Sequence, residues 1–366
     1  MKRIRTSCKV ALFLLLAVVM LTSCGRADIL VPSGAAAEEG GAVPPDDAAM
    51  EKHQKQVFAM DTVMILTAYG PSGEAALDAA EARIFELEAD LDPESAAGSV
   101  HALNAGTGGQ VVISRDCFNV MSTAMDIWQR SGGALDPGMY PLSKAWGFIG
   151  GDYRVPPQAE INALLAAKNT GGIRLDAAAC AATVPAGMEV SFGAVAKGYT
   201  AQAVCDLMAD MGVESAILSL GGNVQSLGET KPDGAAWQVA VTDPYDTGAY
   251  VGYLSVGQDA VVTSGGYQRF FERDGVRYIH ILDPATGYPV DNDLLSVTVV
   301  TDDGAKADAL STALFVLGRD AALEFYREQG GFELVLITTD DHVIVTPGLA
   351  NAFTEAADGY VYEYPG

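Results

Sequence analysis

Short runs of β-branched and aromatic residues fill the C-terminal half of the chain, and they constrain its fold more than any other feature. Runs such as AVVTS at 260–264 and LLSVTVV at 294–300 alternate with Gly, Pro and Asp turns, as expected for short strands. RDGV, with Asp274 and Gly275 at its centre, has the residues of a tight hairpin turn. This half of the chain is therefore expected to be mostly β-sheet.

Helical periodicity appears on both sides of these runs. Apolar residues recur every three to four positions through 74–91, with Leu77, Ile84 and Leu91 on one face. Strand and helix runs are partly segregated, which favours an α+β fold over a doubly wound parallel sheet. We expect one compact domain over 56–366, with a mainly antiparallel sheet and flanking helices. Further helices are expected over 114–130, 158–167, 194–211, 305–317 and 320–329, and strands over 57–69, 188–192 and 334–338.

The first residues have the pattern of an export signal. Basic residues between Lys2 and Lys9 precede an apolar run, Val10–Leu21, which is too short to span a bilayer comfortably. The run ends in LTSCG, which resembles a bacterial lipobox whose cysteine, here Cys24, is acylated after cleavage. An ordinary secretory signal with a chance cysteine is the alternative.

These features predict a lipoprotein signal peptide over 1–23. Residues 24–55 are rich in Ala, Gly, Pro and acidic residues, so they are expected to be a flexible membrane tether. The domain would then be lipid-anchored to the cell membrane, facing the extracytoplasmic side.

The formal net charge of −25 limits the ligands that the chain can bind. It argues against nucleic acid, because binding nucleic acid requires Lys and Arg to neutralise phosphates. A phosphate ligand remains possible if a divalent cation lies between the phosphate and the protein.

The segment GAKADALSTALFVLG carries a candidate metal site. Asp308 and Thr312 are four residues apart on a predicted helix, so both project from one face. A carboxylate and a hydroxyl are hard oxygen ligands of the type that Mg²⁺ accepts. Solvated polar residues on a helix are the alternative, but this helix is otherwise small and apolar, and polar residues close to its core face need partners.

The segment VSFGAVAKGYT carries a candidate anion site. A strand is expected to end at Phe192, Gly193 permits a tight turn, and a helix follows. A helix N-terminus presents unpaired N–H groups that suit phosphate, and Lys197 lies in the first turn. A surface lysine beside a packing glycine is the alternative.

Two further segments contain candidate binding or catalytic residues. GGALDPGMYPLSKAWGF, which includes Asp136, reads as a loop of the kind that lines ligand pockets. His280 lies in an apolar run that stops at Asp-Pro-Ala-Thr-Gly. It is either a buried core histidine or a general base, since histidine titrates near neutral pH.

Taken together, these segments resemble the ApbE-type family of FAD:protein FMN transferases, many of which are exported lipoproteins. The resemblance runs from about Phe58 to Thr346. It implies an α+β, T-fold-related domain that transfers FMN from FAD to a Ser or Thr hydroxyl of an exported or membrane acceptor protein, releases AMP and depends on Mg²⁺. The motifs that carry it are FAMDT, GGALDPGMYPLSKAWGF, FGAVAKGYT, LSLGGN, PDGAAWQVAVTDP, TSGGYQRFFERDGVRYIHILDPATGYPV and ADALSTALFVLG.

The resemblance also implies roles for individual residues. It assigns the metal to Asp308, Thr312 and the backbone carbonyl of Ala194, and the general base to His280. The residues that it assigns to FAD are Met60, Ala134, Leu135, Asp136 and Lys197.

The sequence departs from the family pattern at three positions. Ser191 stands where Asp is usual, Asp61 where Gly is usual, and Leu91 where an aromatic residue often stacks on the flavin. Two alternatives to transfer are left open, and Ser191 bears on the second. One is a metal-dependent FAD pyrophosphatase, in which water replaces the acceptor hydroxyl. The other is a non-catalytic FAD-binding lipoprotein.

Overall fold

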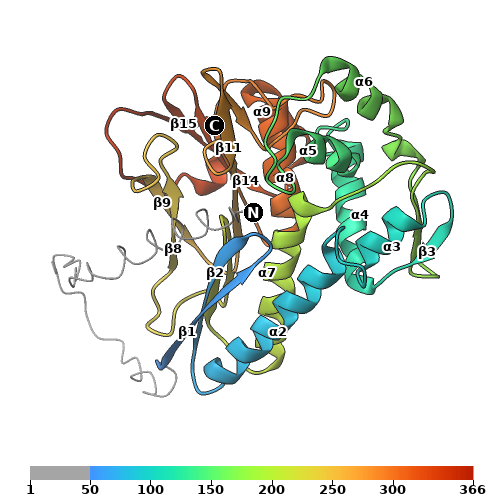
Figure 1. The fold of residues 1–366 in the computed structure, drawn as a ribbon. Coiled ribbons are helices and arrows are strands. Elements are labelled where there is room, and N and C mark those ends of the chain that lie inside the picture. The colour runs from blue at the N-terminus through green and yellow to red at the C-terminus, as the bar shows by residue number, and fades with distance from the viewer. Residues whose placement is uncertain (1–49, 366) are drawn as a thin grey trace, which may run out of the picture. The chain divides into compact units, whose positions relative to one another are not determined.

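The computed structural model describes residues 50–365, which form one α+β domain around a nine-stranded, mainly antiparallel sheet (Figure 1). Three neighbouring pairs, β1–β2, β6–β7 and β14–β15, are hairpins, longer segments connect the other strands, and β15–β17 is a parallel pair. In spatial order, its strands are β1 (Lys52–Ala59), β2 (Thr62–Tyr69), β6 (Ala216–Leu220), β7 (Asn223–Leu227), β10 (Ala260–Gly265), β13 (Leu294–Thr301), β14 (Glu333–Thr338), β15 (His342–Val345) and β17 (Val361–Glu363).

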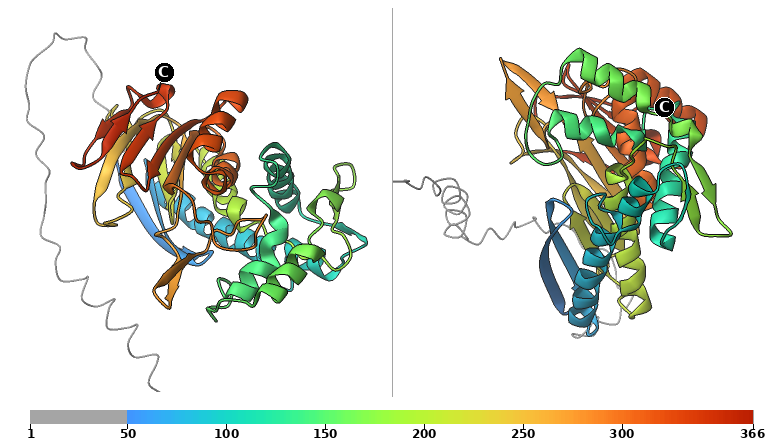
Figure 2. Two further views of the ribbon diagram at one scale, coloured as in Figure 1. Left: turned by 90° about the horizontal axis from the view of Figure 1, so that it is seen from above. Right: turned by 45° about the vertical axis from the view of Figure 1, so that its right-hand side comes forward.

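Helices cover one face of this sheet, and a small sheet covers part of the other (Figures 1 and 2). The small sheet, in the order β16–β9–β8, packs on the main sheet through a cluster that includes Trp237, Val261 and Val343. The helices are α2 (Gly73–Leu91), α3 (Ser99–Ala105), α4 (Arg115–Arg130), α5 (Tyr140–Trp146), α6 (Gln158–Ala167), α7 (Gly193–Asp210), α8 (Gly304–Leu317) and α9 (Arg319–Gln329). The strands of the small sheet are β8 (Trp237–Thr242), β9 (Tyr250–Val256) and β16 (Phe353–Glu355).

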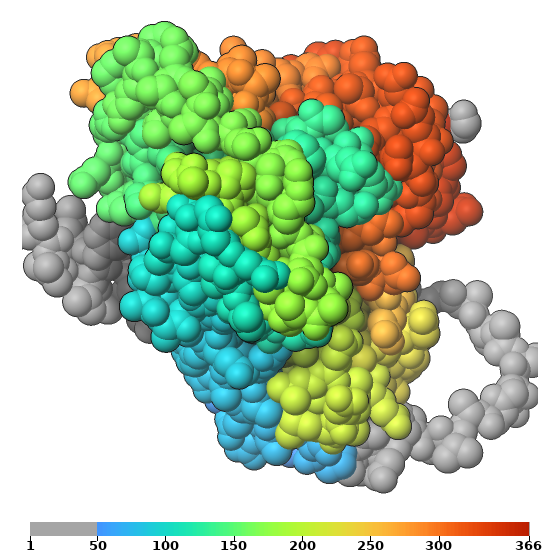
Figure 3. Space-filling view, turned by 90° about the vertical axis from the view of Figure 1, so that its right-hand side faces the viewer, coloured from blue at the N-terminus to red at the C-terminus, as the bar shows by residue number. Residues whose placement is uncertain are grey.

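The helical layer is held by two apolar clusters. One joins α2 and α7 to β1, β2 and β6, with Leu66, Ile84 and Val204 fully buried. The other joins α4 and α8 to the sheet through β10, β13 and β14, with Leu310 and Val299 at its centre. Residues from α2 to α7 form most of the surface on this side (Figure 3). The layering therefore places the N-terminus of α7 and the middle of α8 over the sheet.

The remaining elements lie around this framework. The middle of the chain forms a three-stranded sheet in the order β3–β5–β4, and β11 and β12 form a separate hairpin. Asp274 and Gly275 both have positive φ in that hairpin's turn, as the sequence predicts. The element bounds are β3 (Gln110–Val112), β4 (Arg174–Asp176), β5 (Ala181–Thr183), β11 (Phe270–Arg273), β12 (Val276–Ile279), η1 (Pro137–Met139), η2 (Thr170–Gly172) and η3 (Pro347–Leu349).

The expected single strand over 57–69 is wrong: it is a hairpin. Met60 and Asp61 form the turn between β1 and β2, with φ of 50° and 59°. A two-residue turn of this type normally uses Asn or Gly, so the sequence contains no signal for it. β1 also begins at Lys52, so the last residues of the predicted tether belong to the sheet.

Two other local predictions are also wrong. Residues 188–192 form no strand, although Met188, Val190 and Phe192 are buried, because core burial alone produces the same apolar pattern. The expected loop at 132–148 contains η1 and α5. The predicted signal peptide and Cys24 lie outside the described residues. Over residues 50–365, none of the helices combines the length and apolar character needed to cross a bilayer.

Candidate functional site

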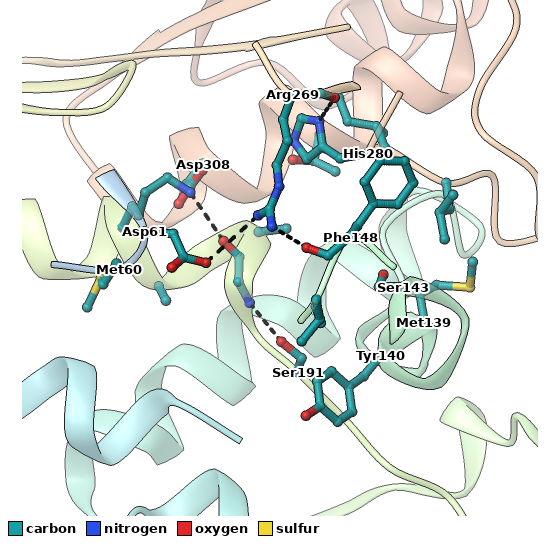
Figure 4. Close-up of a pocket in the computed structure, with 18 of the residues that line it drawn as sticks. Met60, Asp61, Met139, Tyr140, Ser143, Phe148, Ser191, Arg269, His280 and Asp308 are labelled. Carbon is teal, nitrogen blue, oxygen red and sulfur yellow. Dashed lines mark hydrogen bonds and ion pairs between the residues drawn. The ribbon is translucent and has the colours of Figure 1, made fainter. Parts of the chain in front are cut away.

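A cavity of about 980 Å³ opens where α7, α8, the β1–β2 turn and the loop before α5 meet (Figure 4). Its wall combines residues from eight separate stretches of the sequence, so the fold brings together segments that are more than 200 residues apart. All nine residues predicted to bind FAD or metal, or to act as the base, line it: Met60, Ala134, Leu135, Asp136, Ala194, Lys197, His280, Asp308 and Thr312.

Asp308 is held at the point where α7 and α8 cross. Its side chain is buried, and Oδ2 accepts a hydrogen bond of 2.9 Å from the backbone N–H of Gly198. A side chain at Gly198 would collide with the carbonyl of Gly304, and its Cβ would lie 2.7 Å from Cβ of Asp308. Two glycines therefore permit the close crossing that places this carboxylate in the wall.

The hydroxyl groups of Ser311 and Thr312 follow Asp308 on α8, and the hydroxyl of Ser264 faces them from β10. Ser264 Oγ, at the end of β10, lies 2.8 Å from Ser311 Oγ and 3.3 Å from Thr312 Oγ1. In a regular helix the N–H of Gly198 would donate to the carbonyl of Ala194, and the Asp308 carboxylate competes for that N–H. The three groups that the sequence predicts as metal ligands, those of Asp308, Thr312 and the Ala194 carbonyl, would thus all bind a metal through oxygen.

His280 lies just beyond the end of β12, rather than within a strand, and its ring is held by one hydrogen bond. The distance from Nδ1 to the carbonyl oxygen of Arg269 is 3.1 Å. Because a carbonyl can only accept, Nδ1 carries the hydrogen and Nε2 keeps its lone pair. The pKa of His280 is lowered to about 4, chiefly by burial; the hydrogen bond to the Arg269 carbonyl raises it, and the nearby charges of Lys197 and Arg269 lower it. The imidazole is therefore neutral at pH 7.

Both carboxylate oxygens of Asp136 already have partners within the protein. Its side chain is 4% exposed, and Oδ2 lies 2.9 Å from Nζ of Lys168. Oδ1 accepts hydrogen bonds from the N–H of Gly138 at 2.8 Å and the hydroxyl of Thr170 at 2.6 Å. Lys168 also donates to the carbonyl of Pro284, at 2.8 Å. Asp136 therefore shapes the wall and ties it to the turn that follows His280.

Arg269 is a cavity residue that the sequence analysis missed. Its guanidinium lies 3.9 Å from the carboxylate of Asp61 and donates to the carbonyl of Phe148 (Figure 4). Its backbone carbonyl holds the ring of His280. The sequence signal for it is weak, since it stands in an ordinary strand-like run, but it is a basic residue three positions after the Gly265-Gly266 pair of the expected site motif.

The positions that depart from the family pattern also lie in the wall. Ser191, Asp61 and Leu91 all line the cavity. The Ser191 hydroxyl accepts from the N–H of Gly193 at 3.4 Å, at the start of α7. The side chain of Asp61 is 85% exposed and faces Arg269 across the opening. All three departures therefore lie at the site, and Leu91 also belongs to the buried core beneath the helices.

The cavity carries more negative than positive charge. Its basic side chains are Lys197, the fifth residue of α7, and Arg269. An anionic ligand would meet repulsion here unless a cation joined it. Over residues 50–365, no group of three or more His, Cys, Asp or Glu is arranged to hold a metal. A cation would therefore depend on a carboxylate, a hydroxyl and a backbone carbonyl together, those of Asp308, Thr312 and Ala194. The carboxylates in the wall are Asp61, Glu88, Asp92, Glu94, Asp136 and Asp308.

Solved structures define the class of the domain. The chain superimposes on the ApbE protein from Thermotoga maritima with a TM-score of 0.74 and 26% identity, covering 84% of this chain and 97% of that one. It superimposes on the flavinyl transferase ApbE from Pseudomonas stutzeri with a TM-score of 0.70 and 28% identity, covering 79% and 91%. The fold is therefore that of the ApbE-type flavin transferases.

Sequence comparisons agree with this class. Residues 60–336 match the ApbE family. The FAD:protein FMN transferase of Klebsiella pneumoniae is 35% identical over 292 residues, which is 77% of this chain and 90% of that protein. The FAD:protein FMN transferase of Treponema pallidum is 33% identical over 326 residues, or 83% and 89%. The chain belongs to the ApbE family.

Proposed function

We propose that the chain is an FAD:protein FMN transferase that moves FMN from FAD to a Ser or Thr hydroxyl of an exported or membrane acceptor protein and releases AMP. One observation carries the proposal. The residues that the resemblance assigns to flavin, metal and base come from distant parts of the sequence and line one cavity. The acceptor oxygen would form a bond to the FMN phosphorus as the bond from that phosphorus to the AMP oxygen breaks.

His280 supplies the base in this proposal. The hydrogen on Nδ1 is bound to the Arg269 carbonyl, so Nε2 accepts the proton that the acceptor hydroxyl loses. With its pKa below the ordinary value the imidazole is neutral at pH 7, so the lone pair on Nε2 is free to take a proton.

Asp308, Thr312 and the Ala194 carbonyl would hold Mg²⁺. The set fits a hard cation because every donor is oxygen, and because the wall carries more carboxylates than cationic groups. Bound there, Mg²⁺ would stabilise negative charge on the phosphoryl and leaving oxygens.

Lys197 and the start of α7 would bind the diphosphate. The ammonium group, on the fifth residue of the helix, lies 3.4 Å from the carbonyl of Gly193, and the helix N-terminus favours anions. A cation and a helix end beside the same cavity would orient the phosphorus toward the acceptor.

The test is transfer itself. The domain is incubated with FAD, Mg²⁺ and an acceptor protein that has an exposed Ser/Thr flavinylation site, and labelled protein, AMP and free FMN are measured. Labelled acceptor together with AMP is expected. AMP and FMN without label would mean a pyrophosphatase, and FAD binding without either product would mean a flavin-binding lipoprotein.

A further inference from the structure

Asn223 lines the cavity, and no role described above accounts for it. It begins β7 directly after a turn in which Gly221 and Gly222 both have positive φ, at 61° and 98°. Opposite it on β10 is Val262, which is buried in the cluster beneath the helices. Asn223 therefore lies on the face of the sheet that the helices cover.

The carboxamide of Asn223 has an unused donor. The residue is 2% exposed, and its Nδ2 is shielded from solvent with no hydrogen-bond partner among residues 50–365. Buried N–H groups are nearly always paired in native proteins, because leaving one unpaired destabilises the fold. A residue in a ligand cavity with an unpaired buried donor indicates that the acceptor comes with the ligand.

We propose that Asn223 is a substrate-binding residue whose Nδ2 donates to an oxygen of the flavin dinucleotide, either on a phosphate or on the isoalloxazine ring. The assignment rests on the proposed function, because it takes FAD to be the ligand of this cavity. The terminal torsion of an Asn side chain is soft, so a small rotation presents Nδ2 to a bound molecule. A neutral donor suits this wall, since its six carboxylates offer only acceptors when ionised.

The same strand supplies a matched control. Gln225 is two residues along β7 on the same face, is also 2% exposed, and also has an unpaired buried atom, Oε1. It does not line the cavity. Asn223→Asp and Gln225→Glu therefore make the same chemical change in equally buried positions of one strand.

The experiment measures the dissociation constant for FAD by flavin fluorescence, together with the melting temperature of each variant. Asn223→Asp is expected to weaken FAD binding by about tenfold or more, because a donor is lost and a negative charge faces the ligand. Gln225→Glu is expected to change the constant less than about twofold, with a comparable loss in melting temperature. If Asn223→Asp does not fold, Asn223→Ala replaces it, with the same direction expected.

Two ligand fragments identify the acceptor. If the variant binds ADP more weakly and riboflavin equally well, the acceptor is a phosphate oxygen. If it binds riboflavin more weakly and ADP equally well, the acceptor is a carbonyl of the isoalloxazine ring. Unchanged FAD affinity in a folded Asn223 variant, or equal weakening by Gln225→Glu, overturns the assignment. If the unaltered protein does not bind FAD, the proposed function itself fails. Binding by the unaltered protein and the Asn223 variant alike rejects only the role of Asn223.

Discussion

Burial determines what the imidazole of His280 can do. Its pKa of about 4 lies below the ordinary value of 6.5, so the ring loses its proton at a lower pH than a free histidine. The rate of FMN transfer is therefore expected to rise as pH increases through about 4 and to level off above it. His280→Ala should lower the rate by about 10²–10⁴ and remove this acid limb.

The measurement is a pH–rate profile with FAD saturating, beside the FAD dissociation constant. Unchanged FAD affinity is expected in His280→Ala, because the ring is assigned to the acceptor proton and not to the dinucleotide. A rate equal to that of the unaltered protein would return His280 to a structural role.

The same pKa predicts an effect on stability. Between pH 6.5 and about 4 the unfolded chain binds a proton at this histidine and the folded protein does not. The free energy of unfolding should therefore fall as pH falls through this window. His280→Gln should lack this component, which denaturant unfolding at pH 7 and pH 4.5 would reveal as a smaller difference between the two conditions.

Asp308 can be tested with a nearly isosteric change. Asp308→Asn keeps an oxygen that can accept from the N–H of Gly198 but removes the charge that would hold Mg²⁺. Transfer at limiting Mg²⁺ is expected to fall by at least about a hundredfold, with calorimetry showing weaker binding of Mn²⁺ or Mg²⁺.

The control for this change lies on the same helix. Asp303 caps the N-terminus of α8 by accepting from the N–H of Lys306 at 3.0 Å, and it does not line the cavity. Asp303→Asn should lower stability slightly and leave transfer intact. Equal transfer by Asp308→Asn and the unaltered protein at limiting Mg²⁺ would reject the metal assignment.

At the scale of the elements, the close crossing of α7 and α8 positions the site. Gly198→Ala introduces a methyl group that collides with the Gly304 carbonyl, so the helices must separate. The variant is expected to lose about 1–3 kcal/mol of stability or more and to bind metal more weakly, because Asp308 moves with α8. Thermal unfolding compares it with Gly109→Ala, where an added Cβ meets nothing closer than 3.4 Å. Equal melting temperatures would show that the crossing tolerates the methyl group.

The sequence predicts a feature of the site when neighbouring residues determine it, and misses a feature that depends on contacts between distant residues. The four-residue spacing of Asp308 and Thr312 is local to one helix, so it can be recognised without a structure. The turn at Met60 and Asp61 has no glycine, and the Met60 N–H in it donates to Glu88, a residue on α2 that no local pattern relates to the turn. Arg269 was missed for a related reason, because sheet topology, and not a local motif, brings it to the cavity.

For the whole molecule, the remaining question is where the domain works. We expect export and lipid anchoring through Cys24 from the apolar run and LTSCG. Cys24→Ala in the full-length chain should move the protein from the membrane fraction to the soluble fraction and abolish incorporation of labelled palmitate, with transfer by the purified domain unchanged. Continued labelling of the variant would contradict the lipid-anchor assignment.

The excess of carboxylates in the cavity has a thermodynamic consequence. If the diphosphate and the divalent cation each relieve the repulsion that the other meets, their binding is positively cooperative, and the coupling must be reciprocal. Half-saturation by FAD would shift to lower concentration as Mg²⁺ rises, and FAD would tighten the hold on Mg²⁺ by the same factor. Such a protein would respond to the supply of both ligands together and would empty when either became scarce.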